Sequence, residues 1–320
     1  MTFSRVLQFA FSQVWAMEEG FHRKMFQVLL RHAEGVKLSD EEITAATGTE
    51  MRKRSVEMRI EKGVAVIPIH GVIAHRASAV GRLSSNVGTS VEHIRQDLET
   101  AMADDSVQAV VLDVDSPGGS VSGIDELATE IRAARDRKPI VASTDGLMAS
   151  AAYYLASQAD RVIATKSSMV GSIGVLMDGF GFTGLMDKLG VERRLMTAGV
   201  NKGFLDPFSP QTKPQRAHAQ TLLDQIHQQF IQVVRDGRGK RLKETPELFS
   251  GLFWSGEQAV DLGLADGLGN LDYVAREIVK AEDIIDYTRH DNVAERLAKR
   301  FGAAIGEGAV RAMQTMPQVR

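Results

Sequence analysis

The sequence contains no cysteine, and this absence removes several kinds of chemistry at once. A disulfide scaffold, a zinc site built on thiolates and a cysteine nucleophile are all excluded. Covalent catalysis by this chain must therefore use an oxygen or nitrogen nucleophile.

The sequence also lacks an excess of charge of either sign. Its 38 lysines and arginines are balanced by 41 aspartates and glutamates, which gives a net charge of -3. No overall field would hold such a chain on nucleic acid or anionic lipid. The most basic stretch, RDGRGKRLK at residues 235–243, has no interleaved aromatic residues for base stacking, so we interpret it as a solvated loop. We expect no nucleic-acid partner.

Long apolar runs are missing as well. No stretch approaches the roughly 18 to 20 consecutive apolar residues that span a bilayer. Near the N-terminus, Gln8, Ser12 and Gln13 interrupt the apolar residues before a signal-peptide core can form. We therefore expect a cytoplasmic protein without a transmembrane anchor. Its 320 residues, 43% of them hydrophobic, suffice for one large α/β domain with extensions.

The pattern of apolar residues divides the chain into three parts. Residues 1–57 are predicted to be a helical N-terminal extension and a polar linker, and residues 283–320 a partly helical tail. Between them, in residues 58–282, short apolar strands such as VAVIPIHGVI and QAVVLDVD alternate with amphipathic helices such as SVEHIRQDLETAM. This alternation predicts an α/β domain with a mostly parallel sheet that is covered on both faces.

The motif DSPGGS follows a predicted buried strand. Pro117 has no N–H, and glycines adopt backbone angles forbidden to other residues, so the amides of Gly118 and Gly119 can point out of the turn. Such a turn can bind an oxyanion, although Pro and Gly also serve in plain strand-to-helix turns. The motif is not a phosphate loop, because the pattern G-x-x-x-x-G-K-[ST] is absent.

The segment DGLMASAAYYLA brings Ser150 to the first turn of a predicted helix. Small neighbours, Ala149, Ala151 and Ala152, leave room for backbone or substrate. Two roles are open to this serine: a nucleophile close to unpaired amides, or a helix cap. The spacing differs from the nucleophile elbow of α/β hydrolases, because Gly146 lies four residues before the serine rather than two.

A nucleophilic serine needs a base, and no histidine occurs between His93 and His218. A lysine can replace histidine if burial leaves its amine neutral. Lys166 and Lys188 have polar surroundings typical of exposed charges. Lys202 lies in the glycine-flanked segment TAGVNKGFLDPFSP, before several apolar residues. It is the candidate base, with an ordinary surface lysine as the alternative.

The order of these motifs resembles the signal peptide peptidase A family of serine peptidases, which includes phage capsid-maturation proteases. The resemblance covers about residues 60–275: SPGG, DGLMASAAYYLA, RVIA, VGSIGV, the lysine before DPFSP, and LFWSGEQAVDLGLADGLG. It implies a fold like that of the Clp proteolytic subunit and the crotonases, built of repeated strand-strand-helix units. The peptidase domain would comprise residues 58–282.

The resemblance also implies residue roles. Ser150 would be the nucleophile, Lys202 the general base, and Ser172 in VGSIGV the serine that orients the lysine. The oxyanion donors would be backbone amides of Gly118, Gly119 and Ala151. No metal or other cofactor is expected. The family further implies a ring-like homo-oligomer, for which two arrangements stay open: the serine and lysine of one site belong to one chain, or they come from neighbouring subunits.

The predicted substrate is a polypeptide. The N-terminal VWAM and the DYT-containing tail resemble prophage-encoded members, which favours trimming of phage scaffold or portal-associated proteins; signal peptides are the other option. Two alternative functions stay open: a crotonase-like acyl-CoA enzyme, with Asp145 as the nearest carboxylate, and a non-catalytic assembly protein that keeps the fold.

Overall fold

The computed structural model describes residues 15–17, 58–61, 63–76 and 88–278. These residues belong to one compact unit, residues 1–284. The predicted tail at residues 283–320 lies outside the described residues, as does most of the predicted N-terminal extension. Where that extension is described, the helix prediction is wrong, because Trp15–Met17 form a strand.

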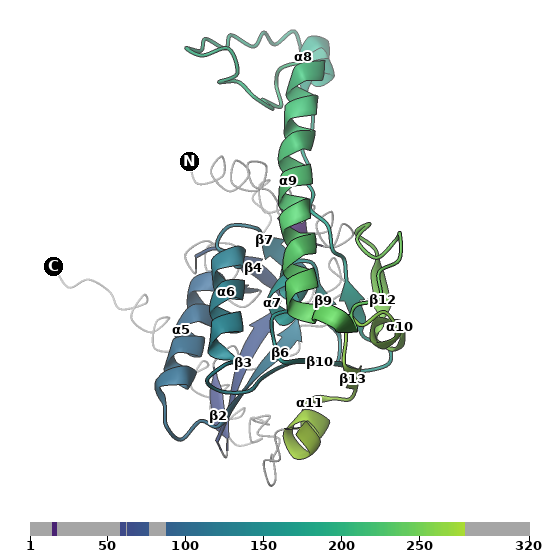
Figure 1. Cartoon of the computed structure of the whole chain (residues 1–320). Helices are drawn as coiled ribbons and strands as arrows, with labels where there is room; N and C mark the ends of the chain where they lie inside the picture. The colour runs from purple at the N-terminus through teal and green to yellow at the C-terminus, as the bar shows by residue number, and fades with distance from the viewer. Residues whose placement is uncertain (1–14, 18–57, 62, 77–87, 279–320) are drawn as a thin grey trace, which may run out of the picture. The chain divides into compact units, whose positions relative to one another are not determined.

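The domain contains three sheets, whose strands are named below in the order in which they lie side by side (Figure 1). The main sheet contains β13 (Gly267–Leu268), β10 (Arg161–Ala164), β8 (Ile140–Thr144), β6 (Ala109–Asp115), β3 (Val64–His70) and β2 (Arg59–Glu61). The second contains β1 (Trp15–Met17), β7 (Gly118–Ser120), β4 (Val72–Ala74) and β5 (Gly88–Ser90), and the third contains β12 (Phe253–Ser255), β11 (Met169–Gly171) and β9 (Leu147–Ala149). In the main sheet every pair is parallel except β2 with β3.

The chain repeats one unit: a strand of the main sheet, a short strand of a smaller sheet, and a helix. The helices that close successive units are α5 (Val91–Ala103), α6 (Ile124–Ala134) and α7 (Ala151–Ala156). The later helical segments are α8 (Thr183–Leu189), α9 (Lys213–Arg238), the 3-10 turn η1 (Gly239–Arg241), α10 (Gly256–Asp261), α11 (Leu271–Tyr273) and the π-helical η2 (Val274–Ile278). The predicted α/β fold of strand-strand-helix units is confirmed.

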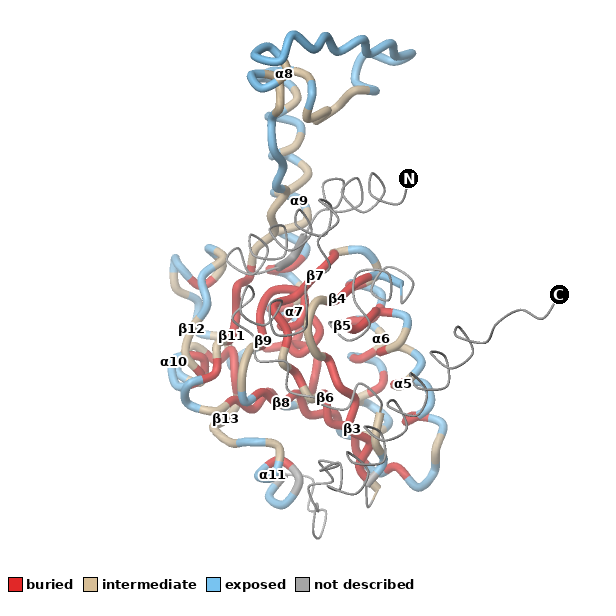
Figure 2. The backbone as a smooth tube through the Cα atoms, turned by 180° about the vertical axis from the view of Figure 1, so that it is seen from behind, coloured by how far each residue is buried: buried red, intermediate tan, exposed pale blue. Residues whose placement is uncertain are grey.

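The main sheet is buried on both faces, as its apolar strands require (Figure 2). Alternate residues of a strand point to opposite faces. On β3, Ala65 and Ile67 join the large core formed with α5, α6 and α7, whereas Val64 and Val66 join a smaller cluster with Val274 of η2. The short strands then turn away from this sheet and carry the DSPGGS and Ser150 motifs.

Helix α9 begins in solvent and ends in the core. A capping box between Thr212 and Gln215 starts it, and its buried residues all lie in its last third. Its 26 residues correspond to a length of about 39 Å. The connection from α8 to α9, residues 190–212, lies beyond the N-terminal end of α9 in both views (Figures 1 and 2).

The C-terminal end of α9 is fixed by close packing and by a buried ion pair. A Cβ at Gly237 would lie 2.2 Å from the carbonyl oxygen of Ser157, so only glycine allows this approach. Arg238 is fully buried and bonded to Asp266. The interpretation of residues 235–243 as a solvated loop is therefore wrong: the stretch completes α9, forms η1, and contributes a buried cation.

In the described part of the chain, no helix is both long enough and apolar enough to cross a bilayer.

Candidate active site

Ser150 occupies the single position between strand β9 and helix α7. Its backbone has φ 55° and ψ -122°, a conformation that is costly for a residue with a Cβ. Two hydrogen bonds hold it there: its N–H donates to the carbonyl of Gly171 at 2.8 Å, and its carbonyl accepts from the N–H of Tyr154 at 2.8 Å. The sequence predicted the helix start, but it did not reveal this strained backbone.

The Ser150 hydroxyl is buried and faces the segment that follows β11. Its Oγ lies 3.5 Å from the carbonyl oxygen of Gly174, and the side chain makes no capping bond to α7. The helix-cap alternative is therefore wrong. A buried hydroxyl with one long, weak hydrogen bond can donate its proton to a base that enters the site.

Ser172, named by the family resemblance as the residue that orients the lysine, follows the strand next to the one that precedes Ser150. Strand β11 runs parallel to β9 and pairs Gly171 with Ala149, so the residues that follow each strand are neighbours. Ser172 is also buried and also has a positive φ, 50°. Its N–H donates to the carbonyl of Leu252 at 2.8 Å. Two serines with positive φ thus follow the ends of adjacent, paired strands.

The DSPGGS turn borders the same place. Ser116 forms an isolated bridge with Met148, and its carbonyl accepts from the N–H of Ala149 at 3.1 Å. The amide of Gly118, expected to point freely out of the turn, instead donates to Ser116 Oγ at 3.1 Å. That hydroxyl in turn donates to the carbonyl of Gly71 at 2.6 Å.

The remaining predicted oxyanion donors have different surroundings. Ala151 is the first residue of α7, so its N–H has no acceptor within the helix. Gly119 lies within β7, where an added Cβ would come 1.9 Å from the carbonyl oxygen of Ile73. Its lack of a side chain therefore allows β4 and β7 to pair closely beside Ser150.

Lys202 is not brought to Ser150 within the chain. It lies in the α8–α9 connection, beyond the N-terminal end of α9, whereas α7 packs near the C-terminal part of that helix (Figure 1). Its side chain is exposed. Lys166, which the sequence predicted to be an exposed charge, makes a long ion pair of 3.9 Å with Glu257, and both side chains are largely exposed.

His227, on α9, was not among the residues that the sequence singled out. Its Nε2 lies 3.0 Å from the carbonyl oxygen of Ile173, between Ser172 and the Gly174 carbonyl that faces Ser150. The sequence did carry a signal, because His227 stands three and four residues before Phe230 and Ile231, which are buried on α9. Its position suits it to hold the 172–174 segment in place.

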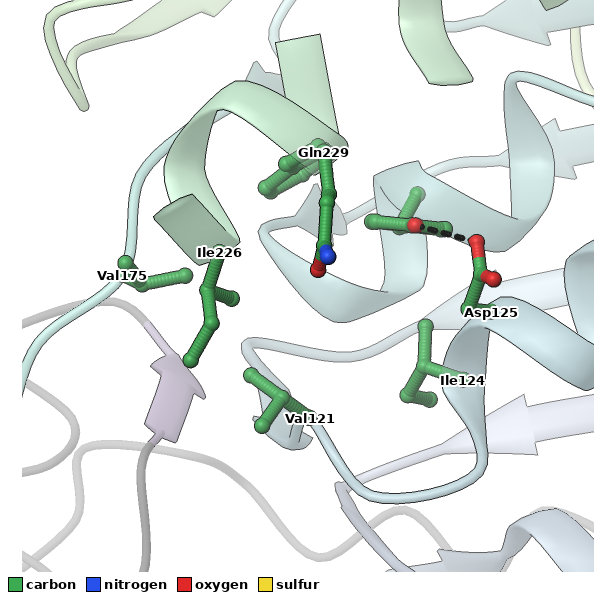
Figure 3. Close-up of a pocket in the computed structure, with 8 residues that line it drawn as sticks. Val121, Ile124, Asp125, Val175, Ile226 and Gln229 are labelled. Carbon is green, nitrogen blue, oxygen red and sulfur yellow. Dashed lines mark hydrogen bonds between the residues drawn. The ribbon is translucent and has the colours of Figure 1, made fainter. Parts of the chain in front are cut away.

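A cavity of about 90 Å³ opens between α6, α7 and α9 (Figure 3). Its lining is mostly apolar: Val121, Ile124, Asp125, Tyr154, Val175, Ile226, Gln229 and Phe230. Val121 directly follows β7, and Val175 directly follows the segment that faces Ser150. The cavity therefore adjoins the end of β7 and the segment that faces Ser150.

One hydrogen bond gives the cavity a polar wall. The Tyr154 hydroxyl donates to Asp125 Oδ1 at 2.7 Å (Figure 3). Burial raises the pKa of Tyr154, and the bond to the nearby carboxylate raises it further, so the phenol stays protonated and keeps donating.

Comparisons with known proteins identify the family. The model of peptidase family S49 matches residues 132–284. The putative protease MJ0651 of Methanocaldococcus jannaschii is 33% identical over 228 residues, covering 69% of this chain and 73% of that protein. The chain therefore belongs to peptidase family S49.

For two other relatives, the match to this chain spans less than half of the relative's own length. The protein named Na(+)/H(+) antiporter NhaA of Brucella melitensis is 39% identical over 214 residues, 66% of this chain but 28% of that protein. Capsid assembly protease C of Escherichia phage lambda is 33% identical over 212 residues, 66% of this chain and 48% of that protein. Among solved structures, an enoyl-CoA hydratase/isomerase family member aligns with 82% of this chain and 87% of its own, at 18% identity and a TM-score of 0.37.

Proposed function

We propose that the protein is a serine endopeptidase that cleaves polypeptides through an acyl-enzyme on Ser150. The observation that carries this proposal is the buried, strained Ser150, which lies between Ser172 and the DSPGGS turn in a chain of peptidase family S49. Strained backbone at a polar residue is concentrated at functional sites, and two serines with positive φ follow adjacent strands here.

The general base is Lys202 of a neighbouring copy. Within one chain the lysine lies on the connection beyond the N-terminal end of α9 (Figure 1), whereas the segment that faces Ser150 contacts α9 through His227, in the second half of that helix. The same region exposes apolar side chains that a partner surface would cover, including Leu189, Met196 and Val200, the last two more than nine-tenths exposed. A head-to-tail arrangement of identical chains would place each lysine on the next copy's serine and would close into a ring.

In the first half of the reaction, neutral Lys202 takes the proton from Ser150 Oγ, and the alkoxide attacks the peptide carbonyl carbon. The amides of Ala151 and the Gly118–Gly119 turn stabilise the oxyanion, for which the Gly118 N–H must leave Ser116 Oγ. Lys202 then returns the proton to the departing amine as the C–N bond breaks. The hydroxyl of Ser172 orients the lysine during both transfers.

In the second half, water replaces the departed amine. Lys202 removes a proton from the water, which attacks the ester carbonyl, and the proton returns to Ser150 Oγ as the ester breaks. The products are a carboxylic acid and the free serine. No step requires a metal ion.

The substrate is an extended polypeptide that adds a strand beside β7 and places a small or apolar side chain in the cavity next to Val121. A phage scaffold or portal-associated protein is the favoured substrate, which the similarity to a lambda capsid assembly protease supports. Signal peptides are the second substrate class.

A serine-directed fluorophosphonate tests the proposal. Intact-mass measurement should find one adduct on the assembled wild-type protein, and none on Ser150→Ala or Lys202→Ala. Ser250→Ala is the matched control: this serine is a loop residue bonded to Glu247, and its loss should leave labelling unchanged. An adduct retained on Ser150→Ala would assign the nucleophile elsewhere.

A further inference from the structure

A short segment from the N-terminal extension adds a strand next to the proposed active site. Residues 15–17 form β1, which pairs antiparallel with β7, setting Trp15 opposite Ser120, Ala16 opposite Gly119 and Met17 opposite Gly118. The other edge of β7 is already taken by β4, through Ile73. Strand β1 therefore fills the remaining edge of the strand that follows the DSPGGS turn.

The direction of β1 is the direction that a substrate would need. Strand β7 starts at the turn beside Ser150 and leads away from it. The acyl half of a substrate must end at Ser150, so along this edge it can run only toward the turn, antiparallel to β7. Strand β1 does run this way, with its last residue, Met17, opposite the first residue of β7.

The cavity lies at the same edge. Strand β7 continues directly into Val121, which lines the cavity together with Val175. Figure 3 draws β1 as the purple strand on the side of the cavity where these two side chains lie. The edge thus combines backbone groups for strand pairing with a pocket for a side chain, as extended-peptide sites do.

We propose that residues 15–17 are a built-in competitor of the substrate. They occupy the acyl-side strand position on β7, so a substrate strand and β1 cannot be bound to the same copy at once. This inference rests on the proposed function, because it assumes that substrate binds at this edge. The occupant is this chain's own segment, and the ligand it excludes is an extended polypeptide.

Steady-state kinetics on an apolar peptide substrate should reveal the competition. A chain that begins at Glu18 should have a KM at least about tenfold lower than the full chain, because a tethered competitor acts at a high effective concentration. The kcat should be unchanged, since saturating substrate displaces β1. Equal KM values for the two chains would overturn the proposal.

Proline variants test the same point in the full-length chain. Successive N–H groups of a strand point to opposite sides, so Ala16→Pro and Met17→Pro together must remove an N–H directed at β7. The double variant should show the low KM of the truncated chain. Prolines introduced at Gly48 and Thr49, in the same extension but outside β1, should keep the full-chain KM.

A binding measurement separates this inference from catalysis. A fluorescent peptide of residues 8–17, QFAFSQVWAM, should bind the Ser150→Ala chain that begins at Glu18, and should bind the full-length Ser150→Ala chain at least about tenfold more weakly. If neither active chain cleaves peptides but this difference persists, the proposed function fails, and only the competition between β1 and a peptide for the edge of β7 is supported. If peptides are cleaved but the two chains bind the probe equally, the competitor fails alone.

Discussion

Removing the carboxylate of Asp266 should destabilise the domain strongly, because it leaves a buried cation without its partner. The fully buried Arg238 donates two parallel hydrogen bonds to Asp266, at 2.8 and 2.9 Å, and a third to the carbonyl of Gly263 at 2.8 Å. Asp266 also accepts from the N–H of Val162 at 2.7 Å and from Arg241 at 3.1 Å. The pair thus joins the end of α9 to β10 and to the segment before β13.

The size of the effect follows from this burial. Breaking a buried ion pair by removing one partner costs about 3–5 kcal/mol. For a domain of this size, that loss in the free energy of unfolding lowers Tm by roughly 6–20 °C. Asp266→Ala should show this shift in thermal unfolding followed by circular dichroism. Glu257→Ala is the control, because its pair with Lys166 is long and exposed, and removing it should change the free energy of unfolding by less than about 1 kcal/mol.

The pH dependence supplies a second check on the same residue. Burial alone would raise the pKa of Asp266, but the hydrogen bonds and charge of Arg238 outweigh it and hold the pKa below its ordinary value. A carboxylate with a depressed pKa stabilises the fold above its unfolded pKa of about 4, and this stabilisation is lost as pH falls through the folded value. The Tm gap between wild type and Asp266→Ala should therefore narrow below about pH 4. A gap of less than about 2 °C at neutral pH would refute the reasoning.

The remaining predictions concern the site. Lys202→Arg should abolish peptide cleavage in a steady-state assay, because the guanidinium stays protonated and cannot act as a base; turnover by the arginine variant would remove the lysine from the mechanism. Gly119→Ala should lower kcat/KM by about 100-fold, because the added Cβ would displace Ile73 and β7. Gly184→Ala is the control: nothing lies within 4 Å of a Cβ at this position, so its kcat/KM should equal that of the wild type. Val121→Phe should fill the cavity and raise KM by about tenfold for peptides with a large apolar residue before the cleaved bond. For peptides with alanine at that position, KM should not change. An equal rise in KM for both peptides would mean that the substrate side chain before the cleaved bond does not enter this cavity.

Local patterns predicted the fold because local and global preferences agree here. The strands VAVIPIH and AVVLDVD are mostly apolar, and the structure buries all of their apolar residues between helices and η2. The same reasoning placed Ser150 at the start of a helix, whereas Ser172 was named only through the family resemblance. It could not give their positive φ values, because those depend on bonds to Gly171 and Leu252 from other parts of the chain.

Other features arise from contacts that no local pattern encodes. Arg238 looks like one charge in a basic stretch, and only the approach of Asp266 from 28 residues away buries it. The bond from the Gly118 amide to Ser116 Oγ is different, because it spans only two residues and is a local serine turn that the sequence interpretation missed. Strand β1 looked helical by its spacing, yet the free edge of β7 pairs with it.

The central claim is that Ser150 and Lys202 of different copies form one site, and mixing two inactive variants tests it most directly. Ser150→Ala and Lys202→Ala should each fail to cleave peptides when expressed alone. Co-expressed in equal amounts and verified as mixed oligomers by mass spectrometry, they should recover about a quarter of wild-type activity, because a site needs an intact serine and an intact lysine from its neighbour. No recovery in verified mixed oligomers would contradict the shared site.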